Sequence, residues 1–493
     1  MIIIKDVVNS LMKPLAHLIN SSFITGIFPD KLKVSKVKPL FKKGDAQKPC
    51  NYRPISILPS FSKIYERAMS LRLIQFLETN NLIDKEQYGF RTGRSVISAN
   101  IDFIEAIIDA IDKGEKAAGV FMDLSKAFDS VSHPKLLNVL QSLGIRGRAF
   151  SWFQSYLSNR KQFVEVSYIN KYNNKTCVPS SLKKLKYGVP QGSILGPLLF
   201  ICYLKGVPDL IKRGNIFMYA DDISFTMSSK NVDDIEEHSF IQLSSINQHL
   251  SDLNLLVNPD KTNYIYFSTP QNIECNKASI FLGEQCLEEV ENTKVLGLEM
   301  DRNLNWNIHV NKICSKISSG LFALRRMSKI CSKETLKTIY CSLIHSHISF
   351  GLILYGGTSL ENLNRILHLQ KQAIRIIFGL DWTDSAREYF PKLGVLTIYS
   401  QYIFELILHI KNNLSDFPTL GSYHNYQTRN NKKICYVVHR LKFLEKKPSY
   451  AGVSFYNSLP IRILNIKDTS MFKKELKFFF KSKPLYSLQE FFM

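Results

Sequence analysis

The 493-residue sequence lacks the cysteine pairs and long apolar runs that point to several common classes of protein. Its nine cysteines are scattered, and no two stand in a C-x-x-C pair, so the sequence predicts neither a zinc ribbon nor a redox motif. No run of about 18 apolar residues is present, and we therefore expect no membrane-spanning segment and no membrane partner. The start of the chain, Met1 to Ile4, has no apolar stretch followed by a small-residue cleavage site, so no signal peptide is expected.

Acidic residues are scarce relative to basic ones. Lysine and arginine number 64 against 42 aspartates and glutamates, which gives a net charge of +22. Such an excess favours a polyanionic partner, nucleic acid before a membrane surface. A basic protein without such a partner is the alternative that the composition leaves open. The 45% hydrophobic content allows a large core and argues against global disorder.

The stretch Tyr219-Ala220-Asp221-Asp222 lies between two short apolar runs and predicts a β-hairpin with two acids at its turn. Two adjacent carboxylates repel each other, so their position makes sense if they share hard cations such as Mg²⁺. An ordinary Asp-rich turn is the alternative for these four residues alone. Asp123 is the candidate third carboxylate, because it ends a buried strand that could neighbour the hairpin in one sheet. Asp129 is a rival acid further along the chain.

Changes in composition and in the spacing of apolar residues predict how the chain is organised. Residues 1–35 are expected to form an N-terminal helical extension, residues 36–304 mix strands and helices, and the segment from 305 to 420 turns helical. Residues 421–493 mix basic and aromatic side chains and have an uncertain fold. A helix after Pro59 is predicted to bury the face that carries Phe61, Ile64, Tyr65, Ala68 and Leu71. Later helices are expected over Ile308–Met327, Lys333–His347 and Leu363–Phe378.

Several ordered motifs carry a family resemblance. The segments FMDLSKAFDSV, YGVPQGSILGP, YADD and NPDKT, in this order, resemble the reverse transcriptase domain of non-LTR (LINE-type, jockey-like) retrotransposons. The upstream NYRPISILPSFSKIYER and QYGFRTGRS are similar to the finger motifs of that family. The resemblance implies an α+β right-hand polymerase, with fingers and palm (antiparallel sheet plus helices) over 36–304, a helical thumb over 305–420 and a basic C-terminal region over 421–493.

The resemblance also implies an activity and its site residues. The activity is that of an RNA-directed DNA polymerase, a nucleotidyltransferase that adds dNTPs to a primer 3′-hydroxyl by two-metal phosphoryl transfer in retrotransposon copying. Two Mg²⁺ ions, which Mn²⁺ can replace, match Asp123, Asp221, Asp222 and the backbone carbonyl of Leu124. Lys261 matches a catalytic lysine that protonates the leaving pyrophosphate, an exposed turn lysine being the alternative.

The remaining implied roles concern nucleotide and nucleic acid. The nucleotide-binding positions are Lys42, Lys43, Arg53, Leu124, Phe128, Gln191 and Gly192. Cations on the path of the template or duplex are Arg91, Arg94, Arg365, Lys371 and Arg375. Phe128 matches the bulky residue under the sugar that excludes a 2′-hydroxyl, and a core aromatic is its alternative. Arg53 matches a cation that grips the triphosphate, and a surface turn arginine is its alternative.

Expected partners follow from the same resemblance: an RNA template, a DNA primer or target DNA, and dNTPs, with the protein in the nucleus and cytoplasm as a ribonucleoprotein. Elements of this type usually carry an endonuclease, and since none is visible we expect that this chain alone does not nick its target. One alternative function is a catalytically inactive, retrotransposon-derived RNA-binding relic. Another is a group II intron-type maturase, which would need a maturase segment and a DNA-binding or H-N-H tail. The sequence does not decide the oligomeric state.

Overall fold

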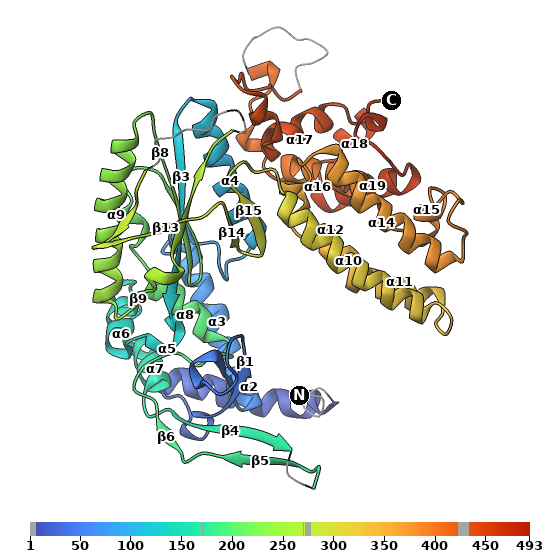
Figure 1. Cartoon of the computed structure of the whole chain (residues 1–493). Coiled ribbons are helices and arrows are strands. Elements are labelled where there is room, and N and C mark those ends of the chain that lie inside the picture. Colours follow the sequence, from blue (N-terminus) through green and yellow to red (C-terminus); the bar gives the residue numbers. More distant parts are fainter. Residues whose placement is uncertain (1–5, 170–171, 270, 272–277, 423–432) are drawn as a thin grey trace.

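The computed structural model describes residues 6–169, 172–269, 271, 278–422 and 433–493. Figure 1 shows a central sheet with covering helices, a smaller sheet beside the N-terminal helix, and a separate helical body that holds the C-terminal part of the chain. We call these parts the palm sheet, the finger sheet and the helical body. This organisation is the α+β right-hand arrangement that the sequence predicts. None of the described helices is long and apolar enough to cross a membrane.

The palm sheet has the strand order β13-β10-β3-β8-β7, and β9 pairs with the end of β3. Its strands are β3 (Lys116–Ser125), β7 (Asn215–Tyr219), β8 (Asp222–Ser229), β9 (Leu256–Val257), β10 (Asn263–Phe267) and β13 (Glu288–Glu289). The pairings are antiparallel except that of β10 with β13. The small hairpins β11 (Phe281–Leu282) with β12 (Gln285–Cys286) and β14 (Asn292–Val295) with β15 (Leu298–Asp301) follow.

Helices cover both faces of the palm sheet, which explains why β3 is apolar without alternation. Phe121 packs into the core on the side of α4 (Val96–Asp112), and its neighbour Val120 packs into the core on the side of α8 (Leu195–Tyr203) and α9 (Val232–Asp252). Gly119 allows α4 to approach closely, because a Cβ there would lie 2.7 Å from the Phe103 ring. Burial on both faces leaves the ends of the strands as the place for polar chemistry.

The finger sheet has the strand order β2-β1-β4-β5, with β6 paired to β4. Its strands are β1 (Val34–Phe41), β2 (Tyr52–Ile57), β4 (Lys161–Ile169), β5 (Lys175–Pro179) and β6 (Lys183–Lys184). The helices of this part are α2 (Val8–Thr25), α3 (Ser60–Thr79), α5 (Ala127–Ser130), α6 (His133–Ser142) and α7 (Gly147–Leu157). The β1–β2 register places Leu40 opposite Arg53.

The buried face of α3 differs from the predicted one. Tyr65 is buried as expected, but Phe61 and Leu71 are 39% and 52% exposed. The buried face instead carries Tyr65, Met69 and Leu73 together with Glu66, which is fully buried. The Glu66 carboxylate accepts the backbone N–H of Ile194 at 2.7 Å, just before the start of α8, and so satisfies a donor that lacks a partner within that helix.

The helical body confirms the three helices expected after residue 305. It contains α10 (Asn307–Met327), α11 (Lys333–Tyr340), a π-helix (Cys341–His345), α12 (Ser346–Ser349), α13 (Leu352–Tyr355), α14 (Leu360–Phe378), α15 (Tyr389–Leu393), α16 (Ile398–Asn412), α17 (Pro448–Asn457), α18 (Ile461–Leu464) and α19 (Thr469–Ser482). α17 and α19 pack on α16, so the described residues after 432 share one hydrophobic core with those before 420.

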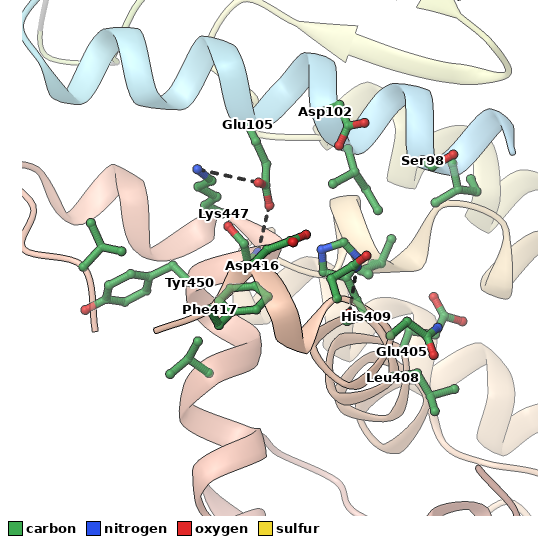
Figure 2. A pocket seen from close by; sticks show the side chains of 18 of the residues that line it. Ser98, Asp102, Glu105, Glu405, Leu408, His409, Asp416, Phe417, Lys447 and Tyr450 are labelled. Carbon is green, nitrogen blue, oxygen red and sulfur yellow. Dashed lines mark hydrogen bonds and ion pairs between the residues drawn. The ribbon is translucent and has the colours of Figure 1, made fainter. Parts of the chain in front are cut away.

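The C-terminal segment also contacts the palm. Lys447 Nζ lies 2.8 Å from a carboxylate oxygen of Asp109 and 3.6 Å from one of Glu105, both on α4. Arg440 donates to the backbone carbonyls of Ile111 and Asp112 at the end of the same helix. Figure 2 shows the Lys447–Glu105 pair at the edge of a cavity of about 940 Å³ between α4, α16 and α17. These contacts attach the helical body to the palm far from the acidic turn.

Candidate active site

Strand pairing brings the three predicted acids to one edge of the palm sheet. β3 and β8 are antiparallel neighbours in a register that pairs Asp123 with Asp222. Tyr219 of β7 pairs with Asp222 of β8, so Ala220 and Asp221 alone form the turn between these strands. The neighbour of β3 is β8, which begins at Asp222. Asp123 therefore lies next to Asp222 and close to Asp221 in the adjoining turn.

The three acids, Asp123, Asp221 and Asp222, lie close enough for their charges to interact. Burial raises the pKa of Asp222 to about 6, and the charges of Asp221 and Asp123 add to this shift. The pKa of Asp221 is also raised, by burial and by Asp123. Lys261, in a short 3-10 helix (Pro259–Lys261), holds Asp123 with its Nζ 3.1 Å from Oδ2. Carboxylates whose charges raise the pKa of a neighbour in this way favour the approach of a positive charge.

The acidic turn is held by residues of the QYGFRTGRS segment, which is similar to a finger motif of the family. Ala220 has a positive φ of 57°, which is uncommon for a residue with a side chain. Gln87 Oε1 accepts the backbone N–H of Ala220 at 3.1 Å and that of Gly89 at 2.8 Å. A Cβ on Gly89 would lie 2.7 Å from the Ala220 nitrogen. Gln87 and Gly89 therefore fix the turn, a role that the sequence did not suggest.

The loop that contains Gln191 and Gly192 joins the finger strand β2 to the palm. The carbonyl of Gln191 accepts the backbone N–H of Ser56 at 2.7 Å. Gly192 has a φ of 121°, and a Cβ there would lie 2.5 Å from the carbonyl oxygen of Ser56, so only glycine fits. The side chain of Gln191 donates to Asp129 Oδ2 at 2.9 Å.

The finger cations lie close enough to the acids to affect their titration. The positive charges of Arg53 on β2 and Lys42 just after β1 partly oppose the rise in the pKa of Asp221. Lys42 partly opposes that of Asp222 as well. Lys42, Lys43 and Arg53 are exposed, and none of them pairs with a carboxylate in the part of the chain that the structure describes. This surface can therefore accept an anionic ligand between the cations and the acids.

Phe128 is half-buried, and its ring stacks on the buried Phe200 with 4.5 Å between centroids. Its place under the sugar stays a prediction. Leu124 is buried at the end of β3, where it pairs with Val257 of β9. Both residues lie within the segment of β3 and α5 that also carries Asp123.

The five cations assigned to the nucleic-acid path all have protein partners. Arg91 forms a two-pronged ion pair with Glu78, and Arg94 lies over the ring of Tyr88. In the helical body the partners are Asn311 and Asn362 for Arg365, the ring of Tyr486 for Lys371 and the carbonyl of Asp384 for Arg375. The Nζ of Lys371 is 4.2 Å from the Tyr486 centroid, and burial lowers its pKa. Their contact with nucleic acid stays a prediction.

Comparison with known proteins decides the family. A sequence profile of the reverse transcriptase (RNA-dependent DNA polymerase) family matches residues 41–300, more than half of the chain. The chain belongs to the reverse transcriptase family. The match covers the strands and loops that carry the acids, the finger cations and Gln191. The LINE-type resemblance read from the motifs agrees with it.

This reverse transcriptase is similar to retrotransposon proteins from Drosophila melanogaster. It is 28% identical over 389 residues to the probable RNA-directed DNA polymerase from transposon X-element, a match that covers 76% of this chain and 41% of that protein. It is also 28% identical over 418 residues to the RNA-directed DNA polymerase from mobile element jockey, covering 80% of this chain and 44% of that protein. The chain thus spans about two-fifths of the length of these curated relatives.

Among solved structures, this reverse transcriptase can be superposed on apo telomerase from Candida tropicalis. The superposition has a TM-score of 0.45 and 15% sequence identity, and it covers 83% of this chain and 71% of that chain. The likeness is a loose one.

The donor set of this reverse transcriptase fits hard divalent cations. Asp123, Asp221 and Asp222 offer carboxylate oxygens, and burial together with the charges of Asp221 and Asp123 raises the pKa of Asp222. Among the described residues no group of three or more His, Cys, Asp or Glu side chains is placed to hold a metal ion by itself. Mg²⁺ is commonly held by one or two carboxylates together with substrate phosphates, so an open set of this kind suits it.

Proposed function

We propose that this member of the reverse transcriptase family is an RNA-directed DNA polymerase that adds dNTPs to a primer 3′-hydroxyl and serves retrotransposon copying. The observation that carries the proposal is the pairing of Asp123 with Asp222 at the acidic turn, opposite the exposed cations Lys42 and Arg53. Divalent cations held at the acidic edge would, together with the basic side chains of the finger strands, neutralise the negative charge of a triphosphate. The family match and the names of the retrotransposon relatives support the same activity.

In this proposal Asp123, Asp221 and Asp222 hold two Mg²⁺ ions, which when bound stabilise the charge that develops on the transferred phosphoryl group. Arg53 and Lys42 bind the triphosphate oxygens, and Phe128 lies under the sugar. Lys261, whose Nζ lies 3.1 Å from Asp123 Oδ2, would donate a proton to the leaving pyrophosphate. The partners are an RNA template, a DNA primer or target DNA and dNTPs, and the protein acts in the nucleus and cytoplasm as a ribonucleoprotein.

The test is incorporation of labelled dTTP on a poly(rA)/oligo(dT) template with Mg²⁺, for the wild type and for Asp221→Asn. We expect the wild type to extend the primer and the variant to lose at least about 90% of the turnover, since metal-held charge is worth several kcal/mol. Binding of the primer-template should stay within about twofold, because no cation changes. Wild-type binding without incorporation would support the alternative, an RNA-binding relic. Retained turnover in Asp221→Asn would refute the assignment of the acid.

A further inference from the structure

Asp129 lies where the segment after β3 meets the loop that carries Gln191. It belongs to the short helix α5, and its carboxylate is half-buried. The charges that raise the pKa of Asp222 are those of Asp221 and Asp123. Burial raises the pKa of Asp129, and the hydrogen bond from Gln191 and the charge of Lys126 oppose this shift in part. The side chain of Gln191 is the hydrogen-bond partner of Asp129, with Nε2 2.9 Å from Oδ2.

The main chain on both sides of this contact is fixed. The N–H of Gly188 donates to Val131 at 2.8 Å and that of Val189 donates to Phe128 at 2.9 Å, so the loop is joined to the α5 segment. A Cβ on Gly188 would lie 2.8 Å from the carbonyl oxygen of Asp129. The carbonyl of Gln191 is bonded to Ser56 of the finger strand, as described above. Asp129 is therefore an acceptor at a fixed place, facing a residue whose backbone is also fixed.

The chemistry of the pair determines which end of the amide is free. An ionised carboxylate only accepts hydrogen bonds, so the NH₂ end of Gln191 must face Asp129. In the described structure Asp129 is the hydrogen-bond partner of this amide, with Nε2 2.9 Å from Oδ2. The carbonyl Oε1 is then the end that can meet a ligand. Without Asp129 the amide could rotate and present either end.

We propose that Asp129 is a positioning residue that holds the amide of Gln191 in the orientation in which it contacts the incoming deoxynucleotide. The proposal rests on the proposed function, because it assumes the nucleotide-binding role that the family resemblance implies for Gln191. Asp129 does not touch the nucleotide. Its loss should weaken nucleotide binding more than turnover, since the acids and finger cations stay in place.

The experiment measures kcat and KM for dTTP on poly(rA)/oligo(dT) with Mg²⁺, using the full chain. Asp129→Ala should raise KM about tenfold and change kcat by less than about threefold, the scale of a lost hydrogen bond to a charged group. Asp129→Asn keeps an acceptor for Nε2 and should stay within about threefold of the wild type. The matched control is Asp233→Ala, an exposed acid on α9, which should leave both constants unchanged. Melting curves report whether each variant is folded.

An exchange of donor and acceptor gives the sharpest readout. Gln191→Glu places a second carboxylate against Asp129 and should raise KM at least about tenfold by repulsion. Adding Asp129→Asn restores a donor–acceptor pair with the roles reversed, and KM should return to within about threefold of the wild type. A packing role for Asp129 would not produce this recovery.

The outcomes separate the inference from the function on which it rests. No incorporation by the wild type would refute the proposed function, and the inference with it. An active wild type with an unchanged KM in Asp129→Ala would overturn the inference alone. If Asp129→Ala does not fold, the double variant Gln191→Glu with Asp129→Asn decides. A KM for dTTP in the double variant as high as that of Gln191→Glu alone would show that Asp129 does not position Gln191.

Discussion

Replacing Asp222 by asparagine should stabilise the metal-free protein and weaken its response to Mg²⁺. The change keeps the shape of the side chain and removes a charge that burial, Asp221 and Asp123 all disfavour. They raise the pKa of Asp222 from 3.8 to about 6, which for a fully buried group would correspond to about 3 kcal/mol at roughly 1.4 kcal/mol per unit. Asp222 is desolvated in part by the surrounding protein but still reaches solvent, so screening reduces the expected gain to about 1 kcal/mol.

The sign of the effect depends on pH. An acid whose pKa is higher in the folded than in the unfolded state lowers the stability of the protein only at pH values where the carboxyl group is ionised. That cost is absent below about pH 4, the unfolded pKa, and reaches its full size above about pH 6, the folded one. Asp222→Asn should therefore raise the melting temperature by about 1–2 °C near pH 7.5 and leave it nearly unchanged near pH 4.

Thermal melts with EDTA and with Mg²⁺ check both parts of this prediction. Mg²⁺ stabilises the folded protein by mass action, and the gain should be smaller in the variant because one ligand oxygen has lost its charge. Asp233→Asn, at an exposed position on α9, is the control for the loss of a charge elsewhere. A lower melting temperature of Asp222→Asn in EDTA near pH 7.5, or an equal shift at both pH values, would refute the carboxylate repulsion from which the reasoning starts.

Two further substitutions test the sugar site and the attachment of the helical body. Phe128→Val should admit ribonucleotides, because a smaller side chain leaves room for a 2′-hydroxyl. The measurement is kcat/KM for dCTP and for rCTP in both proteins. An unchanged ratio of these two values would leave Phe128 as a core residue only. Lys447→Met removes the cation between Glu105 and Asp109 and should lower the free energy of unfolding by about 2 kcal/mol, below the range for a fully buried pair because these side chains are partly exposed. Chemical denaturation measures it, with Lys442→Met, which is exposed, as the control; equal losses in both variants would contradict the attachment.

Local sequence patterns predicted the elements whose burial follows a simple period. The apolar run before Asp123 and the apolar runs around Asp221 predicted strands that end at acids, and these strands are neighbours in the palm sheet. The three later helices followed from the same kind of pattern. In α3 the pattern predicted the wrong face, because apolar spacing gives no sign that the buried face includes Glu66, whose carboxylate bonds the start of a helix far along the chain.

The partners of the charged residues were decided by tertiary structure alone. Lys371 could be read from the sequence as a cation on a helix, but its place over Tyr486 depends on how the C-terminal segment packs on the helical body. Asp129 could be read as a spare acid, but its bond to Gln191 exists because the loop and α5 are joined by backbone hydrogen bonds. Periodicity along a chain reports which side of an element is buried. It carries no information about which distant side chain completes a hydrogen bond or an ion pair, since that depends on how separate elements are placed against one another.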